Sequence, residues 1–393
     1  MRRSISIFAL CCALTVAFSA QAAIHRIKAG EANLPFSGAV VAGDLIYIAG
    51  LAGNDENADI GTQTKQTVDN IAATLKKAGA SLDDVVWLGV YLTKAENASG
   101  MDEALAAAFK KNAPARALVV TTSLVGGKSL VEINAIAVRH GVAHHAVLPK
   151  GWQKPTGPYS YAVKAGSTLF ISSINGRNMA DGSAAPTNAG AQTKAIMDNL
   201  VTLLRAGGMT LNDVAAARVW LSDLKYYPNV NAVYRNYYSK DLPARATLQL
   251  TATDQADLVQ ISAVAVGGAH HAVVSAINED NSAGKPNPNY SAGMVAGNRM
   301  WVTGMTGETA DNKTDVGAQT KEALARMLRV LKKGGYAQAQ IVEVNVYLRD
   351  IKMWGQMNAA YKEVFSKDLP VRTSVEADNA GHSLVEIVFS AAR

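Results

Sequence analysis

The sequence predicts an α+β fold in which three tandem copies of one unit form a single-chain pseudotrimer. The segment KDLPARATLQL around Arg245 recurs as KDLPVRTSVEA around Arg372 and, more loosely, as KNAPARALVV around Arg116. The glutamines of the TQTK and AQTK segments keep the same spacing, at Gln63, Gln192 and Gln319. A repeat of this length marks a structural unit, so we expect any functional site to be assembled from the repeat.

The sequence of each unit predicts the order of elements β-β-α-β-α-β-β. In the first unit, residues 36–50 form apolar or alternating runs around a Gly-Asp turn, which predicts a hairpin. Residues 61–79 place Val68, Ile71 and Leu75 on one face of a helix. The segments DDVVWLGVYLT, GMDEALAAAFKK, ARALVVTT and SLVEINAIAV then predict a strand, a second helix and two closing strands. Two helices can cover only one face of such a sheet, so we predict three sheets that face one another around a pseudo-threefold axis.

The N-terminal segment, residues 1–22, is typical of a cleavable secretory signal. It combines two arginines, an apolar run and an Ala-Gln-Ala ending. A membrane anchor is the alternative, but the apolar run is short for a span and no second apolar segment follows. We therefore expect a periplasmic or secreted protein whose repeats occupy residues 23–142, 143–268 and 269–393.

The composition of the chain limits the classes of catalysis and of ligand that can be expected. Both cysteines, Cys11 and Cys12, lie in the signal segment, so the mature chain has neither thiol nor disulfide, which excludes thiol catalysis. Removing Arg2 and Arg3 lowers the formal charge from +6 to +4, and the remaining basic residues are interspersed with acids. This pattern gives no indication of a nucleic-acid surface.

Several segments together resemble the RidA family, also called YjgF. They are GPYSYAVKAGSTLFIS (157–172), NYSAGMVAGNRMWVTG (289–304), the AQTK helices, the LPAR and LPVR segments and the closing strand VEINAIAV. The resemblance covers essentially the whole mature chain and implies a trimeric, chorismate-mutase-like fold, here supplied by one monomeric chain. It also implies ligand sites in the clefts between units and hydrolysis of 2-imino or enamino acids to 2-keto acids and ammonia, without metal or cofactor.

A 2-imino acid presents a carboxylate beside a C=N carbon. Its site needs a cation that holds the carboxylate and a group that positions and deprotonates water. Arg116, Arg245 and Arg372 match the family's carboxylate-binding arginine. An arginine in a surface salt bridge is the alternative, but the threefold recurrence favours ligand binding.

The matching water-orienting carboxylates are Glu132 and Glu386, whereas unit 2 has Gln260, which cannot accept a proton. An acidic side chain between valine and isoleucine on an apolar strand is costly unless it has a partner. An internal Arg–Glu ion pair is an alternative that is compatible with a site role.

The resemblance places a tyrosine and a small hydroxyl residue on the opposite wall of each cleft. These residues are Tyr159 and Ser172 in unit 2, and Tyr290 and Thr303 in unit 3. Unit 1 departs from the pattern with Phe36 and Ala49.

The family's asparagine matches Asn231 and Asn358, with Asp102 in unit 1, although a helix-capping role is the alternative for these residues. Unit 2 also departs from the family pattern with Ser173 where Gly50 and Gly304 keep the family's glycine, the residue that allows a close backbone approach.

We expect the departures from the family pattern, at Gln260, Phe36 and Ala49, to lie in one and the same cleft. A cleft that has lost its carboxylate no longer benefits from its other polar residues. This argument predicts that Arg245 faces Phe36. Two competent sites would then remain, one with Arg116 and Glu132 opposite Tyr290 and Thr303, the other with Arg372 and Glu386 opposite Tyr159 and Ser172.

The AHHAV segments at 143–147 and 269–273 invite a metal interpretation. Adjacent residues of a strand point to opposite faces, and no acidic or cysteine cluster completes a ligand set, which favours a linker or edge strand.

The sequence therefore favours a hydrolase that acts on C=N bonds of small imino acids. The alternatives are a non-catalytic exported module that binds small carboxylates and a holdase-like chaperone with apolar surface patches. Retention of Glu132 and Glu386 favours catalysis, because a carboxylate near an anionic ligand weakens simple binding.

Overall fold

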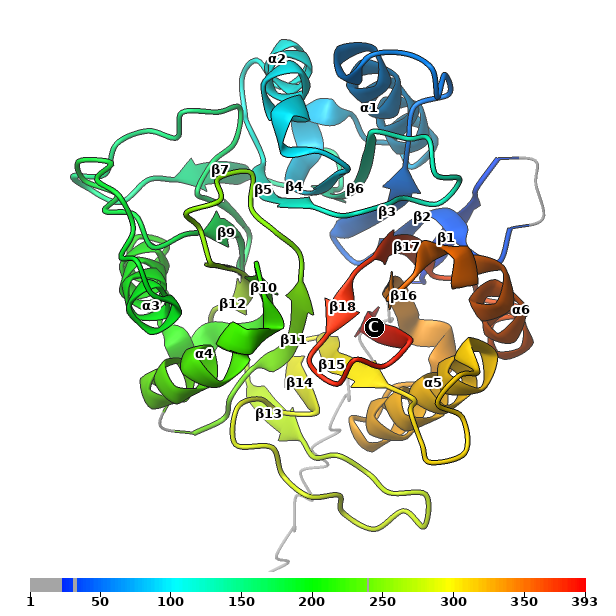
Figure 1. The fold of residues 1–393 in the computed structure, drawn as a ribbon. Helices are drawn as coiled ribbons and strands as arrows, with labels where there is room; N and C mark the ends of the chain where they lie inside the picture. Colours follow the sequence, from blue (N-terminus) through cyan, green and yellow to red (C-terminus); the bar gives the residue numbers. More distant parts are fainter. Residues whose placement is uncertain (1–22, 31–33, 239) are drawn as a thin grey trace, which may run out of the picture.

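The computed structural model describes residues 23–30, 34–238 and 240–393, and the segment interpreted as a signal peptide lies outside them. Three lobes surround a common centre, with the helices outside and the strands inside (Figure 1). This is the predicted α+β pseudotrimer.

Each unit has the predicted order of elements, preceded by one additional short strand. Unit 1 contains β1 (His25–Lys28), β2 (Ser37–Ala42), β3 (Leu45–Leu51), α1 (Ile60–Lys77), β4 (Val85–Leu92), α2 (Ala98–Ala108), β5 (Ala115–Val120) and β6 (Val131–Val138). Unit 2 contains β7 (His144–Val147), β8 (Ala162–Ala165), β9 (Thr168–Ile174), α3 (Ala189–Ala206), β10 (Val214–Leu221), α4 (Tyr227–Tyr234), β11 (Ala244–Gln249) and β12 (Val259–Val266). Unit 3 contains β13 (His271–Val274), β14 (Gly293–Ala296), β15 (Arg299–Thr306), α5 (Val316–Lys333), β16 (Ile341–Leu348), α6 (Trp354–Val364), β17 (Val371–Glu376), β18 (Asp378–Asn379) and β19 (Val385–Ala392).

Short 3-10 helices connect several of these elements. They are η1 (Leu82–Asp84), η2 (Ala95–Asn97), η3 (Leu211–Asp213), η4 (Leu224–Tyr226), η5 (Arg235–Tyr237), η6 (Gln338–Gln340) and η7 (Ile351–Met353). No helix of the described residues is long and apolar enough to cross a membrane.

The strand order within each unit decides where the functional residues lie. In unit 1 the hairpin β2–β3 is followed in the sheet by β6, then β4, and β5 forms the far edge. Units 2 and 3 repeat this arrangement. The two closing strands, β5 and β6, are therefore neighbours in sequence but are separated by β4 in the sheet.

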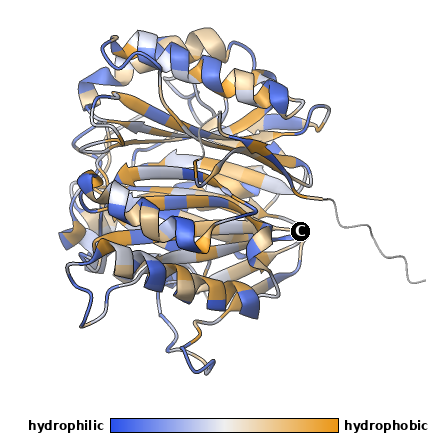
Figure 2. Cartoon of the chain, turned by 90° about the vertical axis from the view of Figure 1, so that its right-hand side faces the viewer, coloured by the Kyte–Doolittle hydropathy of each residue, from blue (hydrophilic) through white to orange (hydrophobic). Residues whose placement is uncertain are grey.

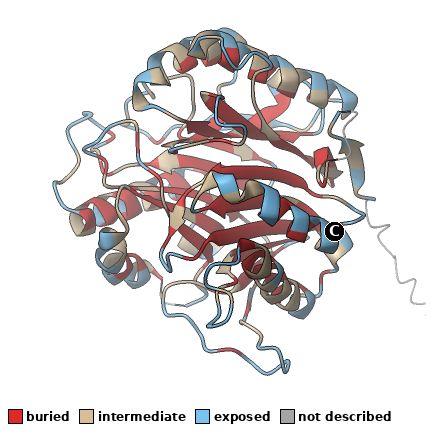
Figure 3. Ribbon diagram, turned by 45° about the vertical axis from the view of Figure 1, so that its right-hand side comes forward, coloured by how far each residue is buried: buried red, intermediate tan, exposed pale blue. Residues whose placement is uncertain are grey.

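The first helix of each unit begins at a polar cap and packs through an apolar face. In α1, the side chain of Asp59 accepts a hydrogen bond from the backbone of Thr62, and the buried face includes Val68, Ile71 and Leu75. The helices are amphipathic, whereas the strands are mostly buried (Figures 2 and 3). Helix-to-sheet packing forms one core per unit, and the opposite sheet faces bury one another at the centre.

Backbone pairing joins the units at equivalent places. Val371 at the start of β17 pairs in parallel with Ser37 of β2. Single parallel bridges connect Ala115 to Ser160 and Ala244 to Ser291 at the other two junctions. Each unit thus contributes one edge strand to the hairpin of the next.

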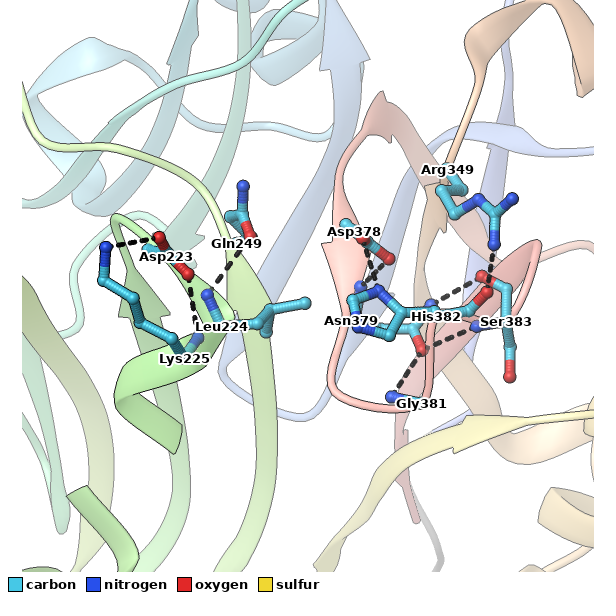
Figure 4. Close-up of polar contacts among 10 residues, drawn as sticks. All are labelled: Asp223, Leu224, Lys225, Gln249, Arg349, Asp378, Asn379, Gly381, His382 and Ser383. Carbon is cyan, nitrogen blue, oxygen red and sulfur yellow. Dashed lines mark hydrogen bonds and ion pairs between the residues drawn. The ribbon is translucent and has the colours of Figure 1, made fainter. Parts of the chain in front are cut away.

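A loop of unit 3 adds a further connection to unit 2. Its strand β18 pairs with β11, and Asn379 holds the turn by donating to the carbonyl of Ser383 (2.8 Å) and accepting from the backbone of Gly381 (3.2 Å) (Figure 4). On the other side of this junction, Gln249 accepts from the backbone of Leu224 (3.2 Å) (Figure 4). The pairing of β18 with β11 therefore joins units 3 and 2 at one end of the molecule, and the side-chain hydrogen bonds hold the segments on either side of it.

Candidate active-site clefts

Adjacent units meet at three junctions, which we call clefts. We name them by the units that form them: cleft 1/2 between β5 and β9, cleft 2/3 between β11 and β15, and cleft 3/1 between β17 and β3 (Figure 1). In each cleft, an arginine from the edge strand of one unit faces the hairpin of the next unit.

The cleft arginines are held by their own backbone as well as by their side chains. Each is the second residue of its strand, directly after the residue that bridges to the next unit. The backbone N–H of Arg116 donates to Oγ of Ser172 (2.7 Å), and that of Arg245 donates to Oγ1 of Thr303 (3.2 Å). These hydroxyls therefore fasten one unit to the next, a positioning role that differs from the ligand contact implied by the family resemblance.

Cleft 2/3 combines every residue type that the sequence assigned to a site. The guanidinium of Arg245 donates from Nη2 to Oδ1 of Asn231 (2.6 Å) and lies 4.9 Å from the ring centre of Tyr234 and 5.5 Å from that of Tyr290. Arg245 is only 2% exposed, and its Nε and Nη1 have no hydrogen-bond partner. Unpartnered buried donors on a cation are expensive, so this side chain is arranged for an anionic ligand.

Glu386 of unit 3 completes the same cleft. Its side chain is buried, and no described residue hydrogen-bonds to its carboxyl group. Burial raises the pKa of Glu386 to about 8, while the positive charges of Arg218 and Arg245 oppose this rise. The negative charge of Glu386 in turn helps to raise the pKa of Tyr290 to about 12, although burial is the main cause. Glu386, Arg245 and Tyr290 are therefore within electrostatic reach of one another.

A cavity of about 470 Å³ opens on the hairpin side of this cleft, and Arg245 and Glu386 are not part of its wall. Tyr290, Thr303 and Gly304 form part of its wall, and Lys285 and Arg326 lie farther along it. This volume is sufficient for a small amino-acid-sized ligand.

Cleft 3/1 keeps the charged pair but has an apolar wall. Nη2 of Arg372 donates to Oδ1 of Asn358 (2.8 Å), its Nη1 is buried without a partner, and the ring of Phe36 lies 4.9 Å from the guanidinium. Burial raises the pKa of Glu132 to about 7, opposed by a backbone hydrogen bond from Ser374 and by the charge of Arg372. The carboxyl group and the guanidinium thus share this cleft, but Phe36 brings no hydroxyl.

Cleft 1/2 keeps the hydroxyl wall but lacks a free cation and a base. Nη1 of Arg116 forms an ion pair with Oδ1 of Asp102 (2.5 Å), and the ring of Tyr159 lies 4.8 Å from the guanidinium. Gln260 stands where the other clefts have glutamate, and neither its Oε1 nor Oγ of Ser173 has a hydrogen-bond partner. A cavity of about 350 Å³ is lined partly by Tyr159 and Ser173.

The predicted pairing of the walls is wrong. Arg245 lies beside Tyr290 and not beside Phe36, and the partner of Phe36 is Arg372. The expected combination of arginine and glutamate from the same unit is also wrong, because Glu132 lies near Arg372 and Glu386 near Arg245. The strand order explains this result: the glutamate strand lies beside the hairpin of its own unit, while the arginine strand is at the opposite edge of the sheet.

As a consequence, the departures from the family pattern fall in two clefts instead of one. Cleft 3/1 has lost Tyr and Ser to Phe36 and Ala49, and cleft 1/2 has lost the glutamate and the asparagine. Only cleft 2/3 combines arginine, asparagine, tyrosine, small hydroxyl and glutamate among the described residues.

Two alternative roles were considered for these residues, helix capping for the asparagines and an Arg–Glu ion pair for the glutamates. Asn231 and Asn358 lie within α4 and α6, not at their caps, and they orient the two arginines. Among the described clefts, the ion pair of a site arginine is with Asp102 and not with a glutamate.

Two tyrosines were missed by the sequence reasoning. Tyr234 and Tyr361 lie under the guanidinium groups of Arg245 and Arg372, at 4.9 Å and 4.7 Å from the ring centres. Their equivalent positions in the repeats, before YYSKDLP and VFSKDLP, could have revealed them.

The paired histidines lie on edge strands. His144 and His145 belong to β7, and His271 belongs to β13, each at the edge of its sheet. Over the part of the chain that the structure describes, no three His, Cys, Asp or Glu side chains gather as a metal site would require.

Comparisons with known proteins also divide the chain into three copies of one domain. A family described as endoribonuclease L-PSP matches residues 26–139, 152–267 and 281–393. The chain is 36% identical over 112 residues to the 2-iminobutanoate/2-iminopropanoate deaminase of Mus musculus, which covers 28% of this chain and 83% of that protein. It is 32% identical over 115 residues to a RutC family protein of Sulfurisphaera tokodaii, covering 29% of this chain and 92% of that protein.

Among solved structures, RidA from an Antarctic Psychrobacter species is 29% identical with a TM-score of 0.30, and the match covers 31% of this chain and 98% of that one. The three family matches together span well over half of the sequence. The protein therefore belongs to the RidA (YjgF) family, described as endoribonuclease L-PSP, and contains three copies of its domain in one chain.

Proposed function

We propose that the protein is an exported imine deaminase with one fully equipped site per chain, in cleft 2/3. The observation that carries this proposal is the pair of unpartnered donors, Nε and Nη1 of Arg245, in the same cleft as the carboxyl group of Glu386. Relatives named 2-iminobutanoate/2-iminopropanoate deaminase support the reaction class. The signal-like segment at residues 1–22 supports export.

In the proposed reaction, the substrate carboxylate accepts hydrogen bonds from the guanidinium of Arg245, whose Nε and Nη1 are otherwise unused. Asn231 holds the guanidinium from the other side through Nη2, so the two remaining donors keep a fixed direction. Burial of the arginine strengthens this contact, because water does not compete for the donors.

Glu386 then takes a proton from a water molecule as its oxygen attacks the C=N carbon. The C=N double bond becomes a single bond as its nitrogen takes the proton that Glu386 has just removed from water, which gives a tetrahedral adduct with a hydroxyl and an amino group. Glu386 then takes the hydroxyl proton and passes it to the amino nitrogen as the C–N bond breaks, which releases the 2-keto acid and ammonia and leaves Glu386 ionised again. Overall, one water is consumed and one ammonia is released, without any redox change.

The elevated pKa of Glu386 suits this role. A general base is most effective when its pKa lies near the working pH, and this carboxyl group has a pKa of about 8. Tyr290, whose pKa is raised to about 12, stays protonated and can donate to the developing amine. The other clefts each lack part of this set, which supports the assignment to cleft 2/3.

Two matched variants test the proposal. Ammonia release is followed from 2-iminobutanoate generated in situ by an amino-acid oxidase, with semicarbazide as a competing trap. Glu386→Gln is expected to lose most of the acceleration, whereas Glu132→Gln in cleft 3/1 is expected to keep it. Equal activity of both variants and the wild type would show that neither carboxylate is the base.

The alternative of a carboxylate-binding module predicts a different outcome. In that case the wild type would bind 2-ketobutanoate in calorimetry, with Arg245 required, yet would not accelerate ammonia release. The chaperone alternative gains little from the described surface, on which the exposed large apolar side chains are Leu148 and Val273.

A further inference from the structure

A third cavity lies at the centre of the molecule, where strands of the three units face one another, away from the clefts. Its volume is about 60 Å³, and strands of all three units line it. None of the cleft arginines, glutamates or asparagines is part of its wall. Its wall is therefore distinct from the residues of the site proposed above, although the charge of Arg218 acts on Glu386.

Arg218 brings a positive charge into this interior. It lies on β10, whose inward positions also carry Ala216 and Trp220. The equivalent positions of the other units hold Gly89 and Asn345, so the repeat does not require a cation here. Within the described residues, the side chain of Arg218 makes neither a hydrogen bond nor an ion pair, although it is half-buried.

Trp220 supplies a second unused donor in the same wall. The residue is 3% exposed, and its Nε1 has no hydrogen-bond partner. Buried indole N–H groups normally find an acceptor, and leaving one without a partner costs free energy. Two side chains with unused donors, Arg218 and Trp220, thus line one small cavity.

Two other polar groups of the wall, Arg299 and Glu343, are already engaged. Arg299 donates to Oγ1 of Thr168 and stacks on Trp301. Glu343, the acidic residue of the wall, accepts from Oγ of Ser390 (3.3 Å) and lies beyond ion-pair distance from Arg218. These groups leave Arg218 and Trp220 without an acceptor.

We propose that this cavity binds a small monocarboxylate of the size of formate or acetate, held by the guanidinium of Arg218 and the indole N–H of Trp220. A guanidinium presents paired donors that match a carboxylate, and the aromatic wall accommodates a methyl group. The cavity is small, which limits the ligand to a few non-hydrogen atoms. A dianion is disfavoured, because Glu343 lies in the same wall.

Intrinsic fluorescence tests the proposal directly. Trp87, Trp220 and Trp301 line the cavity, and they are three of the five tryptophans in the chain. Titrating the mature protein with sodium acetate at constant ionic strength is expected to give a saturable change in emission. Arg218→Met is expected to weaken the apparent affinity by at least about tenfold, because a charge-assisted contact is lost.

The clefts provide the matched control. The double variant Arg245→Met/Arg372→Met removes the two cleft arginines with free donors and is expected to leave the acetate titration unchanged. If Arg218→Met does not fold, Trp220→Phe replaces it, because this variant keeps the aromatic packing and removes one donor. The wild type is expected to broaden the ¹³C-acetate resonance on binding, and Trp220→Phe is expected to broaden it less. A titration that does not saturate, or that is lost only in the double cleft variant, overturns the proposal.

Discussion

Gly304 of β15 and Glu386 of β19 share one small volume: a Cβ atom at position 304 would overlap with Oε1 of Glu386. The same relationship joins Gly50 to Glu132 in unit 1. In unit 2 both partners are different, with Ser173 and Gln260. The glycine of this motif therefore makes room for the carboxyl group of its own unit, and the two residues form one functional pair.

We predict that Gly304→Ala abolishes most of the imine turnover without unfolding the protein. The methyl group would displace the carboxyl group of Glu386, and a displacement of about 1 Å at a reacting group can cost about 100-fold in rate. The measurement is ammonia release beside the melting temperature. Gly50→Ala is the matched control in cleft 3/1, and equal losses in both variants would contradict the assignment of a single working cleft.

The three arginines are expected to differ in their importance. Arg245→Met should lower kcat/KM strongly, because truncating one partner of a buried charge pair costs about 2–5 kcal/mol. Arg116→Met should have little effect, because Asp102 already neutralises that arginine. Ammonia release from 2-iminobutanoate compares the variants, and a dominant effect of Arg116→Met would refute the ranking of the clefts.

Cleft 1/2 should be repairable by three substitutions. Asp102→Asn frees Arg116, Gln260→Glu supplies the base, and Ser173→Gly makes the space that the new carboxyl group needs. In a Glu386→Gln background, the triple variant is expected to regain turnover, whereas Gln260→Glu alone is not. Failure of the folded triple variant to exceed the background would argue against the minimal set proposed here.

Glu386 should make the stability of the protein depend on pH. An unfolded chain ionises this carboxyl group near a pKa of 4.5, whereas the folded chain retains its proton until about pH 8. The folded state binds more protons between these values, so it loses stability relative to the unfolded state as the pH rises through this window. Glu386→Gln should therefore raise the melting temperature at pH 9 more than at pH 4.5.

Thermal unfolding at the two pH values checks this expectation. The exposed Glu279 is the control, and Glu279→Gln should give the same difference from wild type at both pH values. A melting temperature of Glu386→Gln that stays below that of the wild type at pH 9 would contradict the prediction.

The pH profile of turnover should follow the same carboxyl group. If ionised Glu386 is the base, kcat/KM should rise with pH and level off above about pH 8. The charged or titratable groups that act on it are Arg218, Arg245, Tyr290 and Tyr347. Because the charge of Arg218 lowers the pKa of Glu386, Arg218→Met should move the inflection to higher pH, and an unchanged inflection would show that another group controls the profile.

Turnover should not need a metal ion. Both cysteines, Cys11 and Cys12, precede the described residues, and the histidines that suggested a metal lie on edge strands. Dialysis against EDTA is expected to leave the rate of ammonia release unchanged, and a loss that zinc restores would reverse this expectation.

The sequence by itself determined the repeat, the order of elements and the residue types of the site. Helical and strand periodicities are local, and a residue that recurs in three diverged copies, such as Arg245 with its counterparts Arg116 and Arg372, is visible without coordinates. Local patterns also showed that Gln260 and Phe36 break the site pattern. They did not show which cleft each substitution affects.

Only the tertiary structure decided which walls meet. Strands that are consecutive in sequence, such as β5 and β6, are separated by β4 in the sheet, so Arg116 and Glu132 point to different clefts. The ion pair of Arg116 with Asp102 and the unused donors of Arg218 and Trp220 likewise depend on three-dimensional neighbours. Side-chain partners across sheets are set by strand order and by the direction of rotation about the central axis, and neither leaves a periodic signal in the sequence.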